Sequence, residues 1–395
     1  MKREFLDLGK QPIANGFLKK EQFPEEPFFS LRVGFDEETS LVSLMEFVDK
    51  GTLFNENYVY VSSGSETMRK HFEKAAKVIQ NSFSPSRILE IGSNDGVFLK
   101  NFLPKEAIAV EPCSNFANIT RQHGYDTWDA YWDLKTSEEI LLKYGPVDIV
   151  YSANCISHIS DVQKAFEAIT NVLALNGVMV LEDPALDSII ENNAFDQMYD
   201  EHAYIFSVIA LDNLLKKVGL EIFRVEKIKV HGGSNRVYAR KMALKSRPSP
   251  EFSVYQAFAK EQKMGLDKFS TYQNFAENVR TNRDELVRLL TQLKAAGKKV
   301  IGYGATAKSV IITNFCGIGP DLISYISDTT PHKWDTYSPG MHIPVIPAPK
   351  QIASDVDFAF LGAWNFQEEI MKNEAAFVAR GGEFITHVPT VMMLP

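Results

Sequence analysis

The segment at residues 87–99 constrains the fold of this 395-residue chain more than any other part of it. It reads RILEIGSNDGVFL, which is a short apolar run, a glycine turn and the start of a helix. Further apolar runs follow at 107–111, 147–152 and 177–182, and segments with helical periodicity separate them. Because buried strands that alternate with helices form parallel sheets covered on both faces, this pattern predicts an α/β fold.

The chain divides into four sections with different patterns. Residues 1–65 mix Gly and Pro with strand-like pieces, and residues 66–240 hold the alternating strands and helices. Residues 241–296 are dense in Lys and Glu and predict a helical linker, while residues 297–395 predict a second, smaller α/β unit. The predicted strands are 28–35, 40–47, 87–91, 107–111, 125–128, 147–152, 177–182, two within 220–240, 299–303, 322–327 and 357–363, and the predicted helices include 66–80, 251–264 and 275–296.

The glycine turn in 90–96 has the character of a nucleoside site. Gly92 lets the backbone approach a ligand closely, and Asn94-Asp-Gly96 forms a tight turn above the strand end. Glu111 ends the next strand, about 20 residues further on, where a carboxylate can accept both hydroxyls of a ribose. The turn lacks GxGxxG, and Asp95 would repel a pyrophosphate, so a cationic sulfonium nucleoside fits better.

We therefore predict an S-adenosylmethionine site of the class I methyltransferase type, with Asn154 beside the methionine part. The alternatives are a plain strand-to-helix turn of another doubly wound fold and a simple turn role for Asn154. The predicted cofactor-binding residues are Glu90, Gly92, Asn94, Asp95, Gly96, Glu111, Pro112 and Asn154.

The segment FDQMYDEH at 195–202 holds the candidates for acid–base chemistry. His202 could act as a general base with Glu201 orienting it, and Tyr199 could donate a hydrogen bond to a developing oxyanion. His158 follows the strand at 147–152 and is expected at the same end of the sheet. Each histidine could instead be an ordinary surface or loop residue. For His231, which precedes two glycines, a structural role stays as open as a catalytic one.

A second glycine turn opens the last α/β unit, in VIGYGATAKS at 300–309. Backbone amides at a helix start, together with Lys308, predict an anion site suited to a diphosphate. The segment is not a Walker sequence, and the alternative is a nucleotide-type fold that binds nothing.

Together these segments resemble the sugar C-methyltransferases that act on nucleotide-linked 4-keto-deoxyhexoses. The resemblance covers nearly the whole chain. It rests on the order of DLGKQPIANGF, LFNENYVYVSSGS, EIGSNDG, NCISHISD, FDQMYDEHAYIFS, HGGSNRVY, GYGATAKS, SDTTPHKWDTYSPGMHIPV and AWNFQEEI.

The resemblance implies a Rossmann-like methyltransferase core between a small N-terminal domain and a C-terminal Rossmann-like domain. The nucleotide sugar would bind between the core and the C-terminal domain. The family's catalytic histidine falls on His202, with Tyr199, Glu201 and His158 around it, and the tyrosine of its YxYxS motif falls on Tyr58 or Tyr60. The predicted substrate-binding residues are Tyr58, Tyr60, His231, Gly232, Tyr303 and Lys308.

Two departures from the family pattern stand out. The family usually carries two CxxC pairs that hold a structural zinc, whereas here the first has no counterpart ahead of Phe5 and the second would fall near Asp36 and Thr39. We therefore predict no structural zinc. The family's YHEH is YDEH here, so Asp200 replaces a histidine, which leaves the substrate more open than the reaction because His202 remains.

The amino-acid composition limits the kinds of partner that we expect for this chain. A net charge of −8 and a sequence pI near 5.6 argue against a nucleic-acid partner. No stretch approaches the ~20 apolar residues that span a bilayer, the N-terminus has no signal core, and three scattered cysteines indicate a reducing, cytoplasmic setting.

We expect a monomer or weak dimer that methylates a carbon of a nucleotide-linked keto sugar. The alternatives are O- or N-methylation of a nucleotide sugar and a non-catalytic nucleotide-sugar-binding relative.

Overall fold

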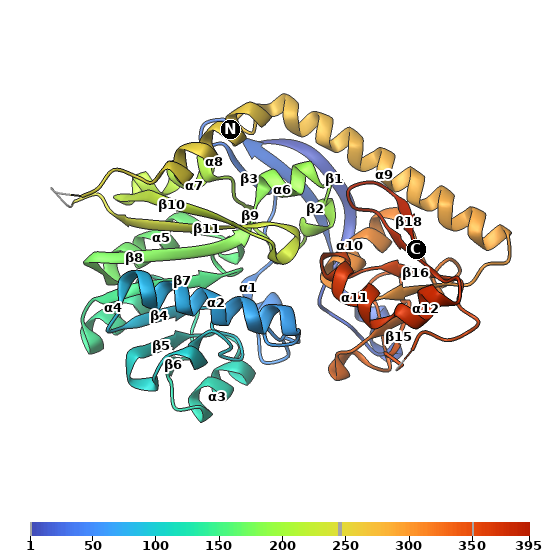
Figure 1. The fold of residues 1–395 in the computed structure, drawn as a ribbon, viewed down its shortest axis with the longest axis horizontal. Coiled ribbons are helices and arrows are strands. Elements are labelled where there is room, and N and C mark those ends of the chain that lie inside the picture. The colour runs from blue at the N-terminus through green and yellow to red at the C-terminus, as the bar shows by residue number, and fades with distance from the viewer. Residues whose placement is uncertain (1, 244–246, 350) are drawn as a thin grey trace.

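The first residues of the segment 87–99 form an inner strand of a seven-stranded sheet in the computed structural model, which describes residues 2–243, 247–349 and 351–395 (Figure 1). Its strand order is β10-β11-β8-β7-β4-β5-β6, and only β11 runs antiparallel to its neighbours. The order reverses between β4 and β7, which is the switch point at which Rossmann-like sheets bind ligands. The predicted Rossmann-like α/β core is confirmed. Its strands are β4 (Ile88–Ile91), β5 (Ala107–Val110), β6 (Asp126–Trp128), β7 (Val147–Ala153), β8 (Leu173–Pro184), β10 (Leu220–Ile228) and β11 (Ser234–Lys241).

Helices cover both faces of this sheet, and alternate residues of β4 face the two layers. Ile88 packs with residues of α2 (Glu66–Phe83), whereas Leu89 packs on the opposite side with residues of α5 (Val162–Val172). The helix α2 begins at Glu66 because the Ser65 hydroxyl caps the backbone N–H of Met68. The remaining helices of the core are α3 (Ser114–Gln122), α4 (Leu134–Tyr144), α6 (Leu186–Glu191) and α7 (Val208–Lys217).

A four-stranded antiparallel sheet precedes the core, in the order β1-β2-β3-β9. The predicted strands correspond to β2 (Phe28–Asp36) and to β3 (Leu41–Leu44), which is shorter than expected. The strand β1 (Lys2–Pro12) was not predicted, because charged residues and two register shifts interrupt its alternation. The last strand, β9 (Tyr204–Ile205), comes from the core segment and pairs with β3. This pairing places the chain just after His202 against the N-terminal sheet.

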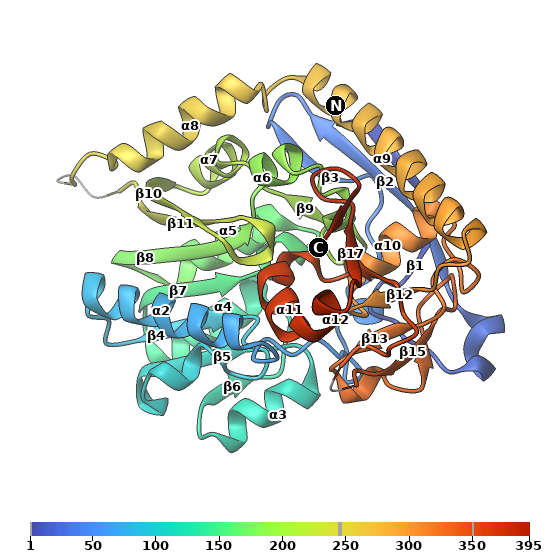
Figure 2. The same cartoon turned by 45° about the vertical axis from the view of Figure 1, so that its right-hand side comes forward.

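Two helices follow the core, α8 (Phe252–Met264) and α9 (Phe269–Ala295), and the second begins earlier than the expected 275. Polar residues around its first turn obscure the helical periodicity of the sequence there. Tyr272 and Phe275 nevertheless belong to the buried face of the helix. That face packs on the N-terminal sheet, with Tyr272 between Phe5 and Phe35 at ring-centroid distances of 5.0 and 4.4 Å. Figure 2 shows α9 running along β1, β2 and β3.

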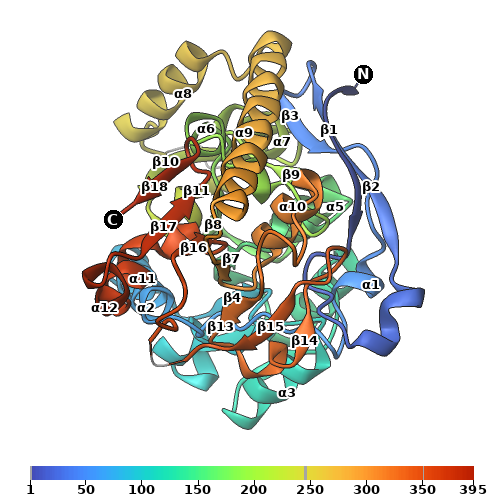
Figure 3. The same cartoon turned by 90° about the vertical axis from the view of Figure 1, so that its right-hand side faces the viewer.

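The C-terminal section forms a second seven-stranded sheet, in the order β14-β15-β13-β12-β16-β17-β18 (Figure 3). The expected strand at 322–327 is wrong in its first half, because Leu322 and Ile323 lie in a turn after Gly319 and the strand begins at Ile326. The strands are β12 (Val300–Tyr303), β13 (Ile326–Asp328), β14 (Thr336–Tyr337), β15 (Pro344–Pro347), β16 (Phe358–Leu361), β17 (Glu383–Thr386) and β18 (Met392–Leu394), and the helices are α10 (Ala307–Cys316), α11 (Gln367–Asn373) and α12 (Ala375–Ala379). Among the described helices, none has the length and apolar character needed to cross a membrane.

Candidate active site

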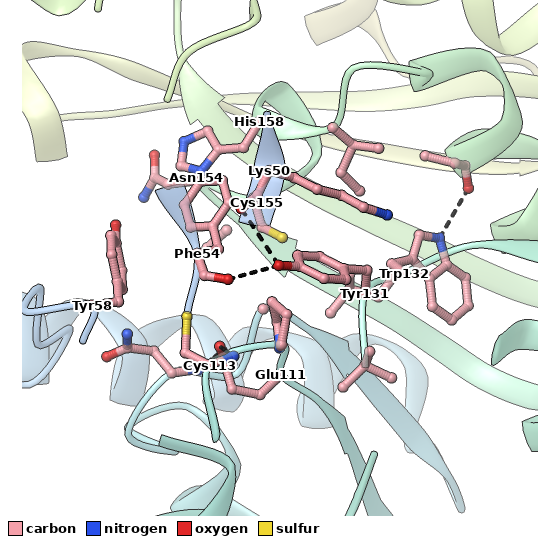
Figure 4. A pocket seen from close by; sticks show the side chains of 18 of the residues that line it. Lys50, Phe54, Tyr58, Glu111, Cys113, Tyr131, Trp132, Asn154, Cys155 and His158 are labelled. Carbon is pink, nitrogen blue, oxygen red and sulfur yellow. Dashed lines mark hydrogen bonds between the residues drawn. The ribbon is translucent and has the colours of Figure 1, made fainter. Parts of the chain in front are cut away.

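A cavity of about 570 Å³ opens above the carboxyl ends of β4, β5 and β7, at the switch point of the core sheet. We call it the first cavity, and its size is that of a small-molecule site. Figure 4 shows Glu111 and Cys113 on one side of it, with Asn154, Cys155 and His158 across from them. Gly92 forms part of its floor with φ of 75°, and a Cβ there would lie 2.7 Å from the Cys155 sulfur. Only glycine therefore fits at this position.

Glu111 is tied to the glycine turn by two backbone hydrogen bonds. Its Oε2 accepts from the N–H of Asn94 at 2.7 Å, and its Oε1 accepts from the N–H of Cys113 at 2.9 Å. Burial raises the pKa of this carboxyl above its ordinary value, while the two amides oppose that shift. The side chain lines the first cavity, so the same carboxylate both braces the turn and faces the space where a nucleoside would lie.

The segment from Phe54 to Ser62 closes the first cavity on its outer side. The Asn94 side chain holds it by accepting from the N–H of Ser62 at 2.8 Å and donating to the carbonyl of Tyr60 at 3.0 Å. The Tyr131 hydroxyl donates to the carbonyl of Phe54 at 2.8 Å, as Figure 4 shows. The N-terminal part of the chain therefore supplies one wall of the site. The short helix α1 (Lys50–Leu53) belongs to the same wall, because Lys50 also lines the first cavity.

Three of the predicted cofactor residues lie elsewhere. Glu90 shares the β4 face of Ile88, is buried on the α2 side, and has an Oε2 without a hydrogen-bond partner in the described part of the chain. Asp95 and Gly96 line a second cavity of about 800 Å³, which Tyr58 separates from the first. The predicted residues that do line the first cavity are Gly92, Asn94, Glu111, Pro112 and Asn154.

His202 is oriented by a backbone carbonyl. Its Nδ1 donates to the carbonyl of Gln197 at 2.6 Å, so the proton lies on Nδ1 and Nε2 keeps its lone pair. Burial lowers the pKa of His202 to about 4, which keeps the ring neutral near pH 7. Within the described residues Nε2 has no hydrogen-bond partner, so it is available as a base.

The prediction that Glu201 orients His202 is wrong. Its two carboxylate oxygens accept from the Asn15 side chain at 2.6 Å and from the Tyr58 hydroxyl at 2.9 Å. Glu201 thus ties the N-terminal part and the wall of the first cavity together. The orienting group, Gln197, was missed because a backbone carbonyl has no signature in the sequence.

Two further candidates surround the His202 ring. Tyr199 lies 4.1 Å from it and His158 lies 5.1 Å from it, measured between ring centroids. Burial raises the pKa of the Tyr199 hydroxyl well above its ordinary value, so the group stays a donor. His158 also lines the first cavity and stacks on Phe54 at 5.4 Å. It therefore lies between His202 and the first cavity.

Asp200, which departs from the family pattern, contacts the N-terminal part of the chain. Its carboxylate oxygens accept from the backbone N–H of Ala14 at 3.3 and 3.2 Å, and the side chain is buried. Burial raises the pKa of this carboxyl well above its ordinary value. In this chain the position braces the loop after β1.

Most backbone N–H groups of the second glycine turn already donate hydrogen bonds within the protein. The N–H of Ala305 donates to Asp328 at 2.6 Å, and Thr306 and Ser309 cap each other at the start of α10. An anion at this turn would therefore depend on Lys308, which makes no ion pair or hydrogen bond within the described residues. The Tyr303 hydroxyl donates to Glu374 at 3.0 Å, within the C-terminal section.

His231 and Gly232 lie in a turn that contacts both halves of the molecule. The His231 carbonyl accepts from the Gln197 side chain at 3.0 Å, and the His231 Nε2 lies 3.1 Å from the Asn154 side-chain nitrogen. A Cβ at Gly232 would lie 2.2 Å from the Trp364 ring. Gly232 is thus required by the approach of the C-terminal section, whereas Gly233 is required by the core, because a Cβ there would lie 2.5 Å from the Ser188 hydroxyl of α6.

Comparison with known proteins gives matches over almost the whole chain. Three family models match the chain, described as a C-methyltransferase C-terminal domain over residues 229–389, a methyltransferase domain over 63–225 and a zinc binding domain over 1–54. The C-methyltransferase NovU of Streptomyces niveus is 31% identical over 393 residues, which cover 98% of this chain and 93% of NovU.

Solved structures give more distant likenesses. A SAM-dependent methyltransferase of Thermotoga maritima, described as a possible histamine N-methyltransferase, is 20% identical and covers 44% of this chain and 88% of that protein, with a TM-score of 0.35. Magnesium protoporphyrin IX methyltransferase of Synechocystis PCC 6803 with bound SAH is 10% identical. The match covers 44% of this chain and 83% of that protein, with a TM-score of 0.34. Each covers less than half of this chain, whereas the match to NovU runs almost from end to end.

The donor set of the N-terminal section does not fit zinc, although a zinc binding domain matches residues 1–54. These residues contain neither Cys nor His, the ligands that structural zinc sites use. In the described ranges, no three or more His, Cys, Asp and Glu side chains gather where they could hold a metal. Instead, Phe5 and Phe35 pack on Tyr272 of α9, and this contact supplies a core for the sheet.

We expect protein purified without added zinc to contain far less than one zinc per chain, because a carboxylate and a hydroxyl at the former ligand positions bind zinc poorly. Elemental analysis of the purified protein measures this directly. Thermal unfolding with and without a chelator is the control, and we expect equal midpoints. One tightly held zinc per chain would contradict the prediction.

Proposed function

Since this chain belongs to the C-methyltransferase family and is an S-adenosylmethionine-dependent carbon methyltransferase, we propose that its substrate is a nucleotide-linked 4-keto-deoxy sugar, methylated at a carbon beside the ketone. The observation that carries the proposal is the geometry of His202. Its Nδ1 is held by Gln197, and its Nε2 is unpartnered within the described residues. A neutral base beside the first cavity suits the removal of a weakly acidic carbon-bound proton.

The size of the first cavity, about 570 Å³, and the residues that line it fit S-adenosylmethionine. Glu111 offers a buried carboxylate for the ribose hydroxyls, and Gly92 leaves room for backbone contact with the methionine part. Asn154 lines the same space from the end of β7. When bound there, S-adenosylmethionine supplies an electrophilic methyl group on a sulfonium.

The chain's own residues would then perform the carbon chemistry. The ketone acidifies the neighbouring carbon, and His202 Nε2 takes the proton while the electron pair moves to the ketone oxygen. Tyr199 or His158 stabilises the resulting enolate by donating a hydrogen bond. The enolate carbon forms the new carbon–carbon bond as the methyl–sulfur bond breaks, and the pair of that bond stays on sulfur. Holding the two carbons at near-attack distance supplies much of the acceleration.

The rest of the substrate would extend toward the C-terminal section. Tyr58 and Tyr60 lie on the wall of the first cavity, and Lys308 offers a cation for a diphosphate from the start of α10. Lys308 also lowers the pKa values of His202 and His231, after the larger effect of burial, so its charge reaches both rings. This effect of Lys308 on both rings supports a nucleotide-sugar site that extends from the base to the start of α10.

A substrate panel tests this proposal. Purified enzyme is incubated with S-adenosylmethionine and with nucleotide-linked 4-keto sugars that differ in base and deoxy position, and products are read by mass spectrometry. We expect at least one keto sugar to gain one methyl group on carbon, located by NMR. The matched 4-hydroxy sugars are the control and should gain none. Transfer to the hydroxy sugars alone would indicate O-methylation and would overturn the proposal.

Replacing Lys308 by Ala is expected to raise the KM of the nucleotide sugar by roughly tenfold or more, the cost of a lost charged hydrogen bond at about 1.5–3 kcal/mol. The affinity for S-adenosylmethionine should stay nearly unchanged, because Lys308 does not line the first cavity. Steady-state kinetics and calorimetry measure the two quantities. Lys294→Ala, which removes an exposed lysine paired with Asp321, is the matched control. Equal loss of substrate and cofactor affinity would show that Lys308 supports the fold or a shared site instead.

A further inference from the structure

Asn154, which lines the first cavity, faces His231, and both residues hold strained backbone conformations. Asn154 has φ of 49° and His231 has φ of 55°, in the left-handed region that residues other than glycine rarely adopt. The side chains of these two residues meet, with the Asn154 Nδ2 and the His231 Nε2 3.1 Å apart. Backbone strain of this kind persists where the surrounding structure fixes it, and it gathers at functional sites.

The contact with Asn154 sets the tautomer of His231. An amide nitrogen can only donate, so His231 Nε2 must accept and the ring proton lies on Nδ1. Burial lowers the pKa of His231 to about 3, so the ring is neutral near pH 7. Among the described residues, no hydrogen-bond partner lies at Nδ1. His231 therefore carries a free N–H donor.

His231 and His202 present opposite chemistry although both carry their proton on Nδ1. His202 donates that proton to Gln197 and leaves a lone pair on Nε2, whereas His231 is held at Nε2 and leaves its N–H free. Gln197 links the two residues, because its carbonyl accepts from His202 and its side chain donates to the His231 carbonyl at 3.0 Å. One short helical turn, Phe195–Gln197, thus fixes a base and a donor together.

The C-terminal section completes this arrangement. The Trp364 ring packs where a Cβ at Gly232 would lie, and its Nε1 donates to Asp196 at 2.7 Å. The turn that carries His231 is therefore held between the short helix of the core and the C-terminal section. The charged and titratable groups that face His231 are Lys308 of α10, His71 of α2, His158, His202 and Glu182 of β8.

We propose that His231 is a second catalytic imidazole, whose Nδ1–H hydrogen-bonds the substrate's ketone oxygen as the enolate forms, and that Asn154 is the positioning residue that fixes its tautomer. This inference rests on the proposed function. As His202 Nε2 takes the carbon-bound proton, the C–H electron pair becomes the carbon–carbon double bond and the carbonyl pair moves onto oxygen. The His231 proton stays on nitrogen and stabilises that charge. A neutral imidazole is suited to this task, because its N–H remains bound while it polarises a carbonyl.

Three substitutions of His231 test the donor. His231→Phe should lower both kcat and the exchange of the substrate's acidic proton with deuterated water by roughly 10²–10³-fold, the effect of losing one oxyanion donor. His231→Asn places an amide near the Nδ1 position and should recover part of the activity. His231→Gln reaches the Nε2 position instead and should not. Calorimetry with S-adenosylhomocysteine should show binding within about twofold of wild type for all three.

Asn154→Asp tests the positioning role, because a carboxylate only accepts and would move the His231 proton to Nε2. The variant should lose kcat near pH 8. Its kcat should rise as pH falls, since a carboxylate neighbour raises the pKa of His231 and the protonated ring regains its Nδ1–H. Wild type should show no such rise, and a merely structural role would not produce one.

The outcomes separate the inference from the proposed function. If wild type methylates a keto sugar while His231→Phe keeps kcat and proton exchange within about threefold, the inference is wrong and the proposed function stands. A pH profile of Asn154→Asp with the shape of wild type would also overturn it. If wild type methylates no keto sugar, the proposed function fails and this inference fails with it.

Discussion

The His202→Asn enzyme is expected to lose methyl transfer by roughly 10²–10⁴-fold, the contribution of a positioned general base. Asparagine suits the test because its amide falls near the Nδ1 position of the imidazole. It can keep the hydrogen bond to the Gln197 carbonyl while removing Nε2. The fold and the affinity for S-adenosylmethionine should therefore stay close to wild type. Circular dichroism and calorimetry check these two properties, and single-turnover kinetics check the rate.

Proton exchange separates loss of the base from loss of a later step. If wild type exchanges the substrate's acidic proton with deuterated water in the presence of S-adenosylhomocysteine, His202→Asn should stop that exchange as well. His123→Asn, which changes an exposed histidine, is the control and should keep both activities. Near wild-type turnover in His202→Asn would end the mechanism as drawn, and His158 would become the next candidate.

The pH profile follows from the same buried ring. Burial lowers the pKa of His202 to about 4, below the ordinary value near 6.5. The base is active when unprotonated, so its activity is present above the lowered pKa and is lost only as pH falls through about 4. We expect kcat/KM to show no fall between pH 7 and pH 5 that depends on His202. An acid limb centred near 6.5 that disappears in His202→Asn would contradict this.

Periodicity along the chain was enough to predict the core. The strands β4, β5 and β7 are short apolar runs buried on both faces, and such runs are readable without any knowledge of their partners. The spacing from the glycine turn to Glu111 likewise depends only on one strand, one connection and the next strand. It can therefore be recognised from the sequence alone. The same alternation also indicates that Glu90 shares the face of Ile88 and points away from the first cavity.

Contacts between distant parts of the chain could not be predicted in this way. Glu201 accepts from Asn15, and β9 pairs with β3, although these partners lie far apart in the sequence. Nothing local in either segment specifies the other. His202 shows the same limit, because its orientation comes from the backbone carbonyl of Gln197, and any residue type could supply a carbonyl.

Loss of the Glu111 carboxylate is expected to weaken S-adenosylmethionine binding by roughly 1–3 kcal/mol, or about 5–150-fold in Kd, in a Glu111→Ala variant. Glu111 also accepts from the backbone N–H groups of Asn94 and Cys113, so the substitution removes two braces of the glycine turn. Glu111→Gln is the matched control, because it keeps the size and one acceptor oxygen. It should fall between wild type and Glu111→Ala in calorimetry.

A modified ligand distinguishes a ribose contact from support of the turn. An S-adenosylhomocysteine analogue that lacks the ribose 2′-hydroxyl should bind wild type more weakly than the parent compound. If Glu111 holds that hydroxyl, removing it should cost little further affinity in Glu111→Ala, because the partner is already gone. The two changes would then be strongly non-additive, as expected for groups in direct contact. Additive losses would mean that Glu111 acts through Asn94 and Cys113 alone, and that another group holds the ribose.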